Sequence, residues 1–234
     1  MSVENMTVNA VDPDGKWLYR VGGISALVIG IGYIIIFPLF ALVGNPPSGG
    51  GEVWLKYLEV KTTVWWAILA LCVFTDFLFV PVALSLYLAL QRVNRYAMLV
   101  ATAFVGLFVV LDLAVTWTNY ASLLTLSRFH AATTNDVQRA AYVAAANYAS
   151  AVLASRTEVF YSIVDLSLAI LLIGFVMLKG KGIFSKTTAY LGVAAGIFGI
   201  AATTGFFVSI IINAVLTTLW VLFVGYRLFR LAQK

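Results

Sequence analysis

The sequence predicts an all-α polytopic membrane protein: a bundle of six transmembrane helices with an extra helical extension on the outer side before the fourth span. Of its 234 residues, 62% are hydrophobic and only 11% are charged, whereas an ordinary soluble domain has about a quarter charged residues. The apolar residues form long runs, and about 20 such residues cross the ~30 Å hydrocarbon core of a bilayer. This pattern excludes a soluble enzyme, a nucleic-acid-binding protein and a disordered chain.

The apolar runs define the spans in chain order. The last apolar stretch is long enough for two crossings, and we divide it near Thr203, Thr204 and Gly205, which form its only small polar break. A fifth span of this kind is at the lower limit of length. The predicted spans, all in one membrane domain over 1–234, are 21–43, 64–90, 96–126, 157–178, 187–203 and 206–231.

Two connections on the predicted outer side differ in character. Residues 44–51 are rich in Gly and Pro and predict a flexible turn. Residues 135–155 are rich in Ala and lack Gly and Pro, which predicts a helix. Asn135, with Gln138 three residues later, resembles a capping box at its start. Together with the long third span, this helix is expected to project beyond the outer face.

The basic residues predict the orientation. Ten lie in the short connections of one side and in both terminal segments: Lys16, Arg20, Arg92, Arg95, Lys179, Lys181, Lys186, Arg227, Arg230 and Lys234. Five lie in the longer loops of the other side: Lys56, Lys61, Arg128, Arg139 and Arg156. The positive-inside rule therefore places both termini in the cytoplasm, as an even number of spans requires. The net charge of +5 reflects this topology, so the lipid bilayer, and no nucleic acid, is the expected partner.

Three carboxyl groups lie inside predicted spans, at Asp76, Asp112 and Asp165. An ionised Asp at the bilayer centre costs at least about 2.5 kcal/mol. Such residues therefore face the interior of the bundle, where they bind partners or stay protonated. Intramembrane ionisable groups generally mark functional sites.

Other polar residues recur at helical spacing beside these acids. Asp112, Thr116 and Asn119 form one stripe, and Glu158, Tyr161 and Asp165 form a second. By depth, all lie at the midplane or in the outer half, which predicts a polar cavity open to the outer side. The candidate ligand-binding residues are Asp76, Asp112, Asp165, Thr116, Asn119, Tyr161, Glu158 and Asn213. The alternative is that these groups only hydrogen-bond neighbouring helices, at roughly 0.6 kcal/mol each.

Several kinds of chemistry find no support. His130 is the only histidine and Cys72 the only cysteine, so paired-histidine haem sites and intrachain disulfides are excluded. No phosphate-binding loop is present. We predict no catalytic residue and no metal site, and the sequence indicates no particular cofactor.

Small and aromatic residues complete the pattern. Gly192 and Gly196 form a GxxxG pair, which predicts close helix packing within the bundle. Tryptophans near the predicted interfaces are typical of an aromatic belt: Trp17, Trp54, Trp65, Trp66 and Trp117.

Two short stretches, Leu191-Gly192-Val193-Ala194-Ala195-Gly196 and Leu219-Trp220 through Gly225-Tyr226-Arg227-Leu228, accompany this layout. The chain resembles prokaryotic six-span integral membrane proteins of uncharacterised function, which carry a domain-of-unknown-function label. The resemblance implies a bacterial or archaeal plasma membrane, and it implies no reaction.

The leading hypothesis is a non-enzymatic role in binding or transporting a proton, a cation or a small amphiphile. A first alternative is a non-catalytic accessory subunit of a larger membrane complex, which would make a membrane protein its partner. A second is an intramembrane enzyme that uses a carboxylate as acid or base. It lacks an obvious nucleophile, so we expect that the protein is not an enzyme.

Overall fold

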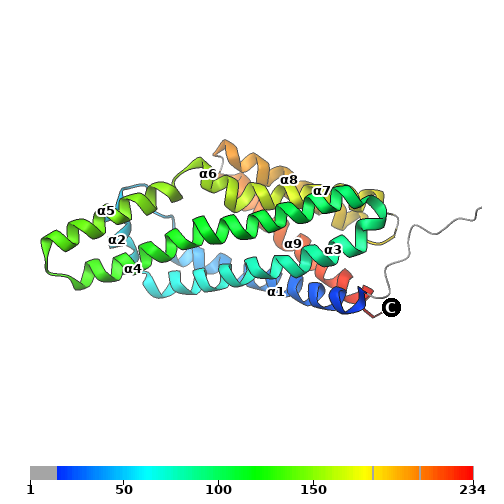
Figure 1. Ribbon diagram of the computed structural model, residues 1–234, viewed down its shortest axis with the longest axis horizontal. Coiled ribbons are helices and arrows are strands. Elements are labelled where there is room, and N and C mark those ends of the chain that lie inside the picture. Colours follow the sequence, from blue (N-terminus) through cyan, green and yellow to red (C-terminus); the bar gives the residue numbers. More distant parts are fainter. Residues whose placement is uncertain (1–14, 181, 206, 234) are drawn as a thin grey trace, which may run out of the picture. The chain divides into compact units, whose positions relative to one another are not determined.

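The computed structural model describes residues 15–180, 182–205 and 207–233, and in these residues the regular structure is entirely helical (Figure 1). The prediction of an all-α protein is thus confirmed. The elements are α1 (Lys16–Val43), α2 (Gly51–Glu59), α3 (Thr62–Leu111), the π-helix η2 (Asp112–Trp117), α4 (Thr118–Ala132), α5 (Asp136–Leu153), α6 (Arg156–Val159), the π-helix η3 (Phe160–Val164), α7 (Asp165–Lys179), α8 (Lys186–Ala201), the 3₁₀-helix η4 (Ala202–Thr204) and α9 (Phe207–Leu231).

Within the described residues, 5 helical stretches are long and apolar enough to cross a membrane. They are Lys16–Val43, Thr62–Ala132, Arg156–Lys179, Lys186–Thr204 and Phe207–Leu231. The second, of 71 residues, is interrupted at Asn94, whose φ of −156° and ψ of 93° are not helical. The Asn94 side chain accepts a hydrogen bond from the Ala97 amide at 3.1 Å, so it caps the helix that follows.

Two compact units divide the chain, and each is described by itself. The first unit contains the described residues up to Gly30, Leu78–Leu107 and those from Ile163 onward. The second unit contains Ile31–Phe77 and Phe108–Ser162. Both α1 and α3 therefore contribute residues to each unit.

In the first unit, α8 packs against both α7 and α9 through small residues. A side chain at Gly196 would place its Cβ 2.8 Å from the Ser167 carbonyl oxygen of α7. The predicted packing role of this glycine is confirmed. Gly205 has a φ of +81°, a left-handed conformation that favours glycine. It ends the helical run after η4, at the break predicted from Thr203, Thr204 and Gly205.

In the second unit, α4 and α5 lie side by side and α2 packs against both (Figure 1). The Asn135 side chain accepts hydrogen bonds from the backbone amides of Val137 and Gln138, at 2.9 and 3.3 Å, and so caps α5 as its sequence suggested. The Gly51 amide donates to Asn147 Oδ1 at 2.6 Å, which attaches the start of α2 to α5. The sequence analysis did not predict α2. It predicted only the flexible turn over 44–51 that precedes this helix.

Aromatic side chains fill the core of the second unit. Trp65 is fully buried and stacks on Tyr120, with ring centroids 4.9 Å apart and planes at 19°. Trp54 is also buried and meets Tyr120 edge to face at 6.0 Å. These two tryptophans are core residues and not part of a lipid-facing belt. Trp17, by contrast, is 74% exposed.

Candidate functional site

Two carboxyl groups of the second unit share one hydrogen-bond donor. The indole N–H of Trp117 donates to Asp76 Oδ2 at 2.8 Å and to Asp112 Oδ2 at 3.0 Å. Asp76 lies in α3 and is 3% exposed, whereas Asp112 begins η2 and is 4% exposed. The carboxyl groups interact directly as well as through the indole. We call Asp76 and Asp112 the carboxyl pair.

The π-helix explains how Trp117 reaches Asp112. In an α-helix, residues three and four apart share a face, and a residue five positions away points elsewhere. A π-helix has i→i+5 hydrogen bonds and a wider turn, and it is frequent at functional sites. Because η2 begins at Asp112 and ends at Trp117, these two side chains lie on the same face.

A third carboxylate connects to the pair through Thr116. The Thr116 hydroxyl donates to Glu158 Oε1 at 3.1 Å, and it also lies beside the Asp112 carboxyl group. Thr116 is 4% exposed, whereas Glu158, in α6, is half-buried. The arrangement forms a polar line from the buried carboxyl pair to a carboxylate that solvent can reach.

The part of the chain that the structure describes forms no ion pair with this polar line. Among the described residues, no lysine or arginine forms an ion pair with Asp76, Asp112 or Glu158. In the same residues, Asp112 Oδ1 is buried and has no hydrogen-bond partner. A buried acceptor without a donor costs roughly 1–3 kcal/mol. Asp112 Oδ1 can therefore accept one more hydrogen bond.

The aromatic core positions the shared donor. The Trp117 ring packs against Tyr120 with centroids 5.6 Å apart, and Tyr120 stacks on the buried Trp65. The Trp65 indole in turn lies 3.3 Å from the Tyr57 hydroxyl, to which it donates. These contacts restrict rotation of the Trp117 indole and hold its N–H between the two carboxyl groups.

The structure brings together four of the sequence-predicted site residues: Asp76, Asp112, Thr116 and Glu158. The side-chain amide of Asn119, in α4, instead donates to the Val115 carbonyl oxygen of the preceding η2 at 2.7 Å. Tyr161 lies half-buried in η3.

The other two predicted residues, Asp165 and Asn213, belong to the first unit. Asp165 is fully buried at the start of α7, and both of its carboxyl oxygens lack a hydrogen-bond partner among the described residues. Asn213 donates to the Ala195 carbonyl oxygen at 2.8 Å and to Ser167 Oγ at 3.3 Å. Asn213 thus joins α9 to α8 and α7.

Trp117 is the site residue that sequence reasoning missed. Its position near a predicted interface suggested a belt residue, and its spacing of five from Asp112 did not match a helical stripe. A tryptophan close to two intramembrane acids was the available signal, because a buried indole N–H generally finds an acceptor.

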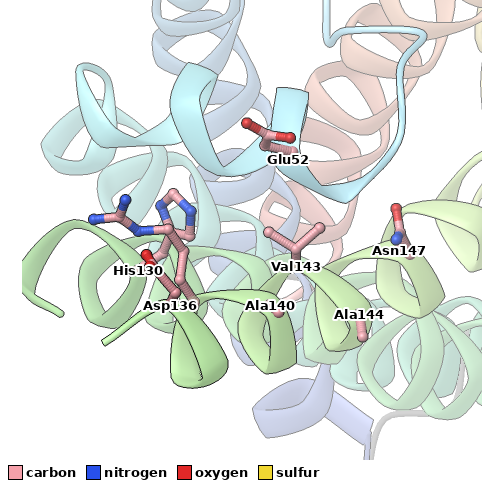
Figure 2. Close-up of a pocket in the computed structure, with 8 residues that line it drawn as sticks. Glu52, His130, Asp136, Ala140, Val143, Ala144 and Asn147 are labelled. Atoms are coloured by element: carbon pink, nitrogen blue, oxygen red, sulfur yellow. The ribbon is translucent and has the colours of Figure 1, made fainter. Parts of the chain in front are cut away.

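A separate hollow of about 400 Å³ lies on the surface of the second unit, between α2, α4 and α5 (Figure 2). Its polar residues include Glu52, His130, Asp136 and Arg139. The hydrogen bond from Lys56, at 2.7 Å, holds the pKa of Glu52 below its usual value. Side chains of both charge signs therefore line this hollow.

Comparison with known proteins yields no relative: no protein-family model, no curated protein and no solved structure matches the chain.

Proposed function

We propose that the chain is a multi-pass membrane protein whose carboxyl pair binds one small positive species, a proton or a monovalent cation, for exchange or transport. The observation that carries the proposal is that Asp76 and Asp112 both accept from the single indole N–H of Trp117 while almost fully buried. Groups of this kind inside membranes commonly belong to ion pathways and proton relays.

Electrostatics supports a bound positive species in this geometry. Two ionised carboxylates about 4 Å apart repel each other by ~4 kcal/mol at an effective dielectric constant of about 20. A neutral N–H offers both acceptors a hydrogen bond but no net charge. One proton or cation between the carboxyl groups removes the repulsion, as in other closely spaced carboxyl pairs.

The membrane arrangement is part of the same proposal. The break at Asn94 supports two crossings within Thr62–Ala132, and with the other stretches this gives six spans. Both termini then lie in the cytoplasm, by the positive-inside rule. The α4–α5 pair then projects on the outer side of the membrane. The sequence resemblance implies that this membrane is a bacterial or archaeal plasma membrane.

A small amphiphile fits the site less well than a proton or ion. Asp76, Asp112 and Thr116 are each at most 4% exposed, and one oxygen of each carboxyl group already accepts from Trp117. Binding an amphiphile would require that the aromatic packing around Trp117 opens.

Infrared spectroscopy of the full-length protein in detergent tests the proposal. At neutral pH we expect a band from a protonated carboxyl group, which disappears in the double variant Asp76→Asn/Asp112→Asn. If the pair holds a cation instead, the band is weak in sodium or potassium chloride and grows in choline chloride. Asp136→Asn, at an exposed position of α5, is the matched control and leaves the band unchanged. A wild-type spectrum identical to that of the double variant in all three salts contradicts the proposal.

A further inference from the structure

We propose that the species held by the carboxyl pair is a proton, and that it travels between Glu158 and Asp112 through the hydroxyl group of Thr116. This inference rests on the proposed function and adds the identity of the species and its route. Three observations support it: the unpartnered oxygen of Asp112, the position of the Thr116 hydroxyl and the partial exposure of Glu158.

The number of available ligands favours a proton over a metal cation. Within the described residues, no group of three or more His, Cys, Asp or Glu side chains is placed to hold a metal ion. Cations exchange their hydration shell for several oxygens at once, six to eight in the case of Ca²⁺. A proton needs a single lone pair, and Asp112 Oδ1 offers one.

The Thr116 hydroxyl is suited to pass a proton because it has one donor and two acceptor sites. In the structure the Thr116 hydroxyl donates to Glu158 Oε1 at 3.1 Å, and the Asp112 carboxyl group lies beside the same hydroxyl. When Glu158 carries a proton, Thr116 Oγ1 accepts it as the hydroxyl proton moves to the Asp112 carboxylate. Glu158 is then ionised, Thr116 is again a neutral hydroxyl and Asp112 is protonated, so atoms and charges balance.

Glu158 is placed to be the entrance of this route. Its backbone amide donates to Ser155 Oγ at 3.2 Å, and its carbonyl oxygen accepts from Ser162 Oγ at 3.0 Å. These bonds fix the first turn of α6, so the side chain stays near Thr116. The preceding residues, Arg156 and Thr157, are exposed, and solvent is therefore one turn away. In the proposed orientation this entrance lies toward the outer side.

Titratable groups from several helices surround the carboxyl pair. Those that interact electrostatically with Asp76 or Asp112 are Tyr33 of α1, Cys72 of α3, Tyr120 of α4 and Glu158 of α6. Of these, Glu158 accepts a hydrogen bond from the Thr116 hydroxyl, which lies beside Asp112. The route through Thr116 is therefore the one that the contacts indicate.

The test compares the rate of proton exchange in variants of Thr116. The full-length protein in detergent is subjected to a pH jump, and the carboxyl infrared band of the pair is followed in time. Thr116→Val removes the hydroxyl with little change of shape, and we expect the band to respond roughly a hundredfold more slowly. Thr116→Ser retains the hydroxyl and restores the rate. Thr118→Val is the matched control, because Thr118 is exposed and its hydroxyl donates to the Leu113 carbonyl oxygen of the preceding η2.

Each outcome separates the route from the site. If Thr116→Val responds as fast as the wild type, or if Thr116→Ser is as slow as Thr116→Val, the route is wrong and the proton site stands. A band that depends on sodium or potassium overturns the choice of a proton but not the proposed function. Glu158→Gln provides a second variant if Thr116→Val does not fold. We expect this variant to slow the response of the carboxyl band while the band itself persists. A response at the wild-type rate would exclude Glu158 as the entrance.

Discussion

The indole N–H of Trp117 lies 3.0 Å from Asp112 Oδ2, five residues earlier in the chain, because both residues belong to the π-helix η2. The same N–H lies 2.8 Å from Asp76 Oδ2 in α3. One donor therefore fixes the positions of two buried acids, and a local change of helix geometry creates the site.

Replacement of Trp117 by Phe removes the shared donor and retains an aromatic ring against Tyr120. Two buried carboxyl oxygens then lose their partner, and we expect a loss of about 1–3 kcal/mol in the free energy of unfolding. Unfolding in mixed detergent micelles, followed by circular dichroism, measures the change. Trp66→Phe is the control, since Trp66 is 43% exposed. Equal losses in the two variants would show that the indole N–H has no special role.

Replacement of Asp112 by Asn and by Ala should affect the stability of the protein differently. Asp112→Asn keeps an oxygen acceptor for Trp117 and removes one potential charge, so we expect stability at least equal to that of the wild type. Asp112→Ala leaves the indole N–H with one acceptor fewer and creates a cavity, at a cost of about 1–3 kcal/mol. The same unfolding assay decides. If Asn destabilises the protein as much as Ala does, the pair is fully ionised and stabilised by a cation that is bound there.

The parts of the fold that sequence reasoning anticipated depend on strong local signals. A long apolar run specifies a helix wherever it occurs, and Asn135 caps α5 because its short side chain reaches the free amides of the first turn. Gly205 similarly supplies a left-handed residue at a polar break. Such features depend on a few neighbouring residues, and a single sequence is sufficient to detect them.

The site was anticipated only in part, for a physical reason. Asp76, Asp112, Thr116 and Glu158 were identifiable as polar groups in apolar surroundings. The role of Trp117 depends on the i→i+5 bonding of η2, which a search at the α-helical period cannot detect. The α2 helix was missed because its apolar residues, such as Trp54 and Leu58, are stabilised by packing in the second unit rather than by a long run.

Asn135 should matter for α5 more than for the rest of the chain. Asn135→Ala removes two hydrogen bonds to the first turn, which is worth about 1 kcal/mol. Because this end of the helix is exposed, we expect faster hydrogen exchange of the Val137, Gln138 and Arg139 amides, with little change elsewhere. Asn135→Ser retains a cap and should preserve the protection. Unchanged exchange in the Ala variant would show that α5 is held by its contacts with α4 alone.

Asp165 offers a test of whether a buried acid serves packing or function. Its carboxyl oxygens have no hydrogen-bond partner among the described residues, so its burial is not compensated. Asp165→Leu keeps the branched shape and removes both polar atoms, and we expect it to raise the free energy of unfolding by about 1–3 kcal/mol. A stabilised variant indicates that the acid is retained for a reason other than stability. A destabilised one indicates a polar partner or a bound water.

The close packing of α7, α8 and α9 depends on the missing side chain of Gly199. A Cβ at this position would lie 1.8 Å from Ser167 Oγ and 2.6 Å from Asn213 Nδ2, so Gly199→Ala forces these helices apart. Overpacking of this kind typically costs about 1–3 kcal/mol. Gly106→Ala is the matched control, because nothing lies within 4 Å of a Cβ at Gly106, and it should be neutral or slightly stabilising.

A second substitution identifies the cause of that loss. Ser167→Gly removes both the hydroxyl and the Cβ that Gly199→Ala would strike, the latter at 2.5 Å. The double variant should therefore be more stable than the sum of the two single effects, with a coupling of at least about 0.5 kcal/mol. Additive effects would contradict the contact, since they would mean that Ser167 and Gly199 do not limit the same helix approach. Coupling would show that Ser167 and Gly199 limit the same helix approach. The hydrogen bond from Asn213 to Ser167 Oγ then depends on the absence of a side chain at Gly199.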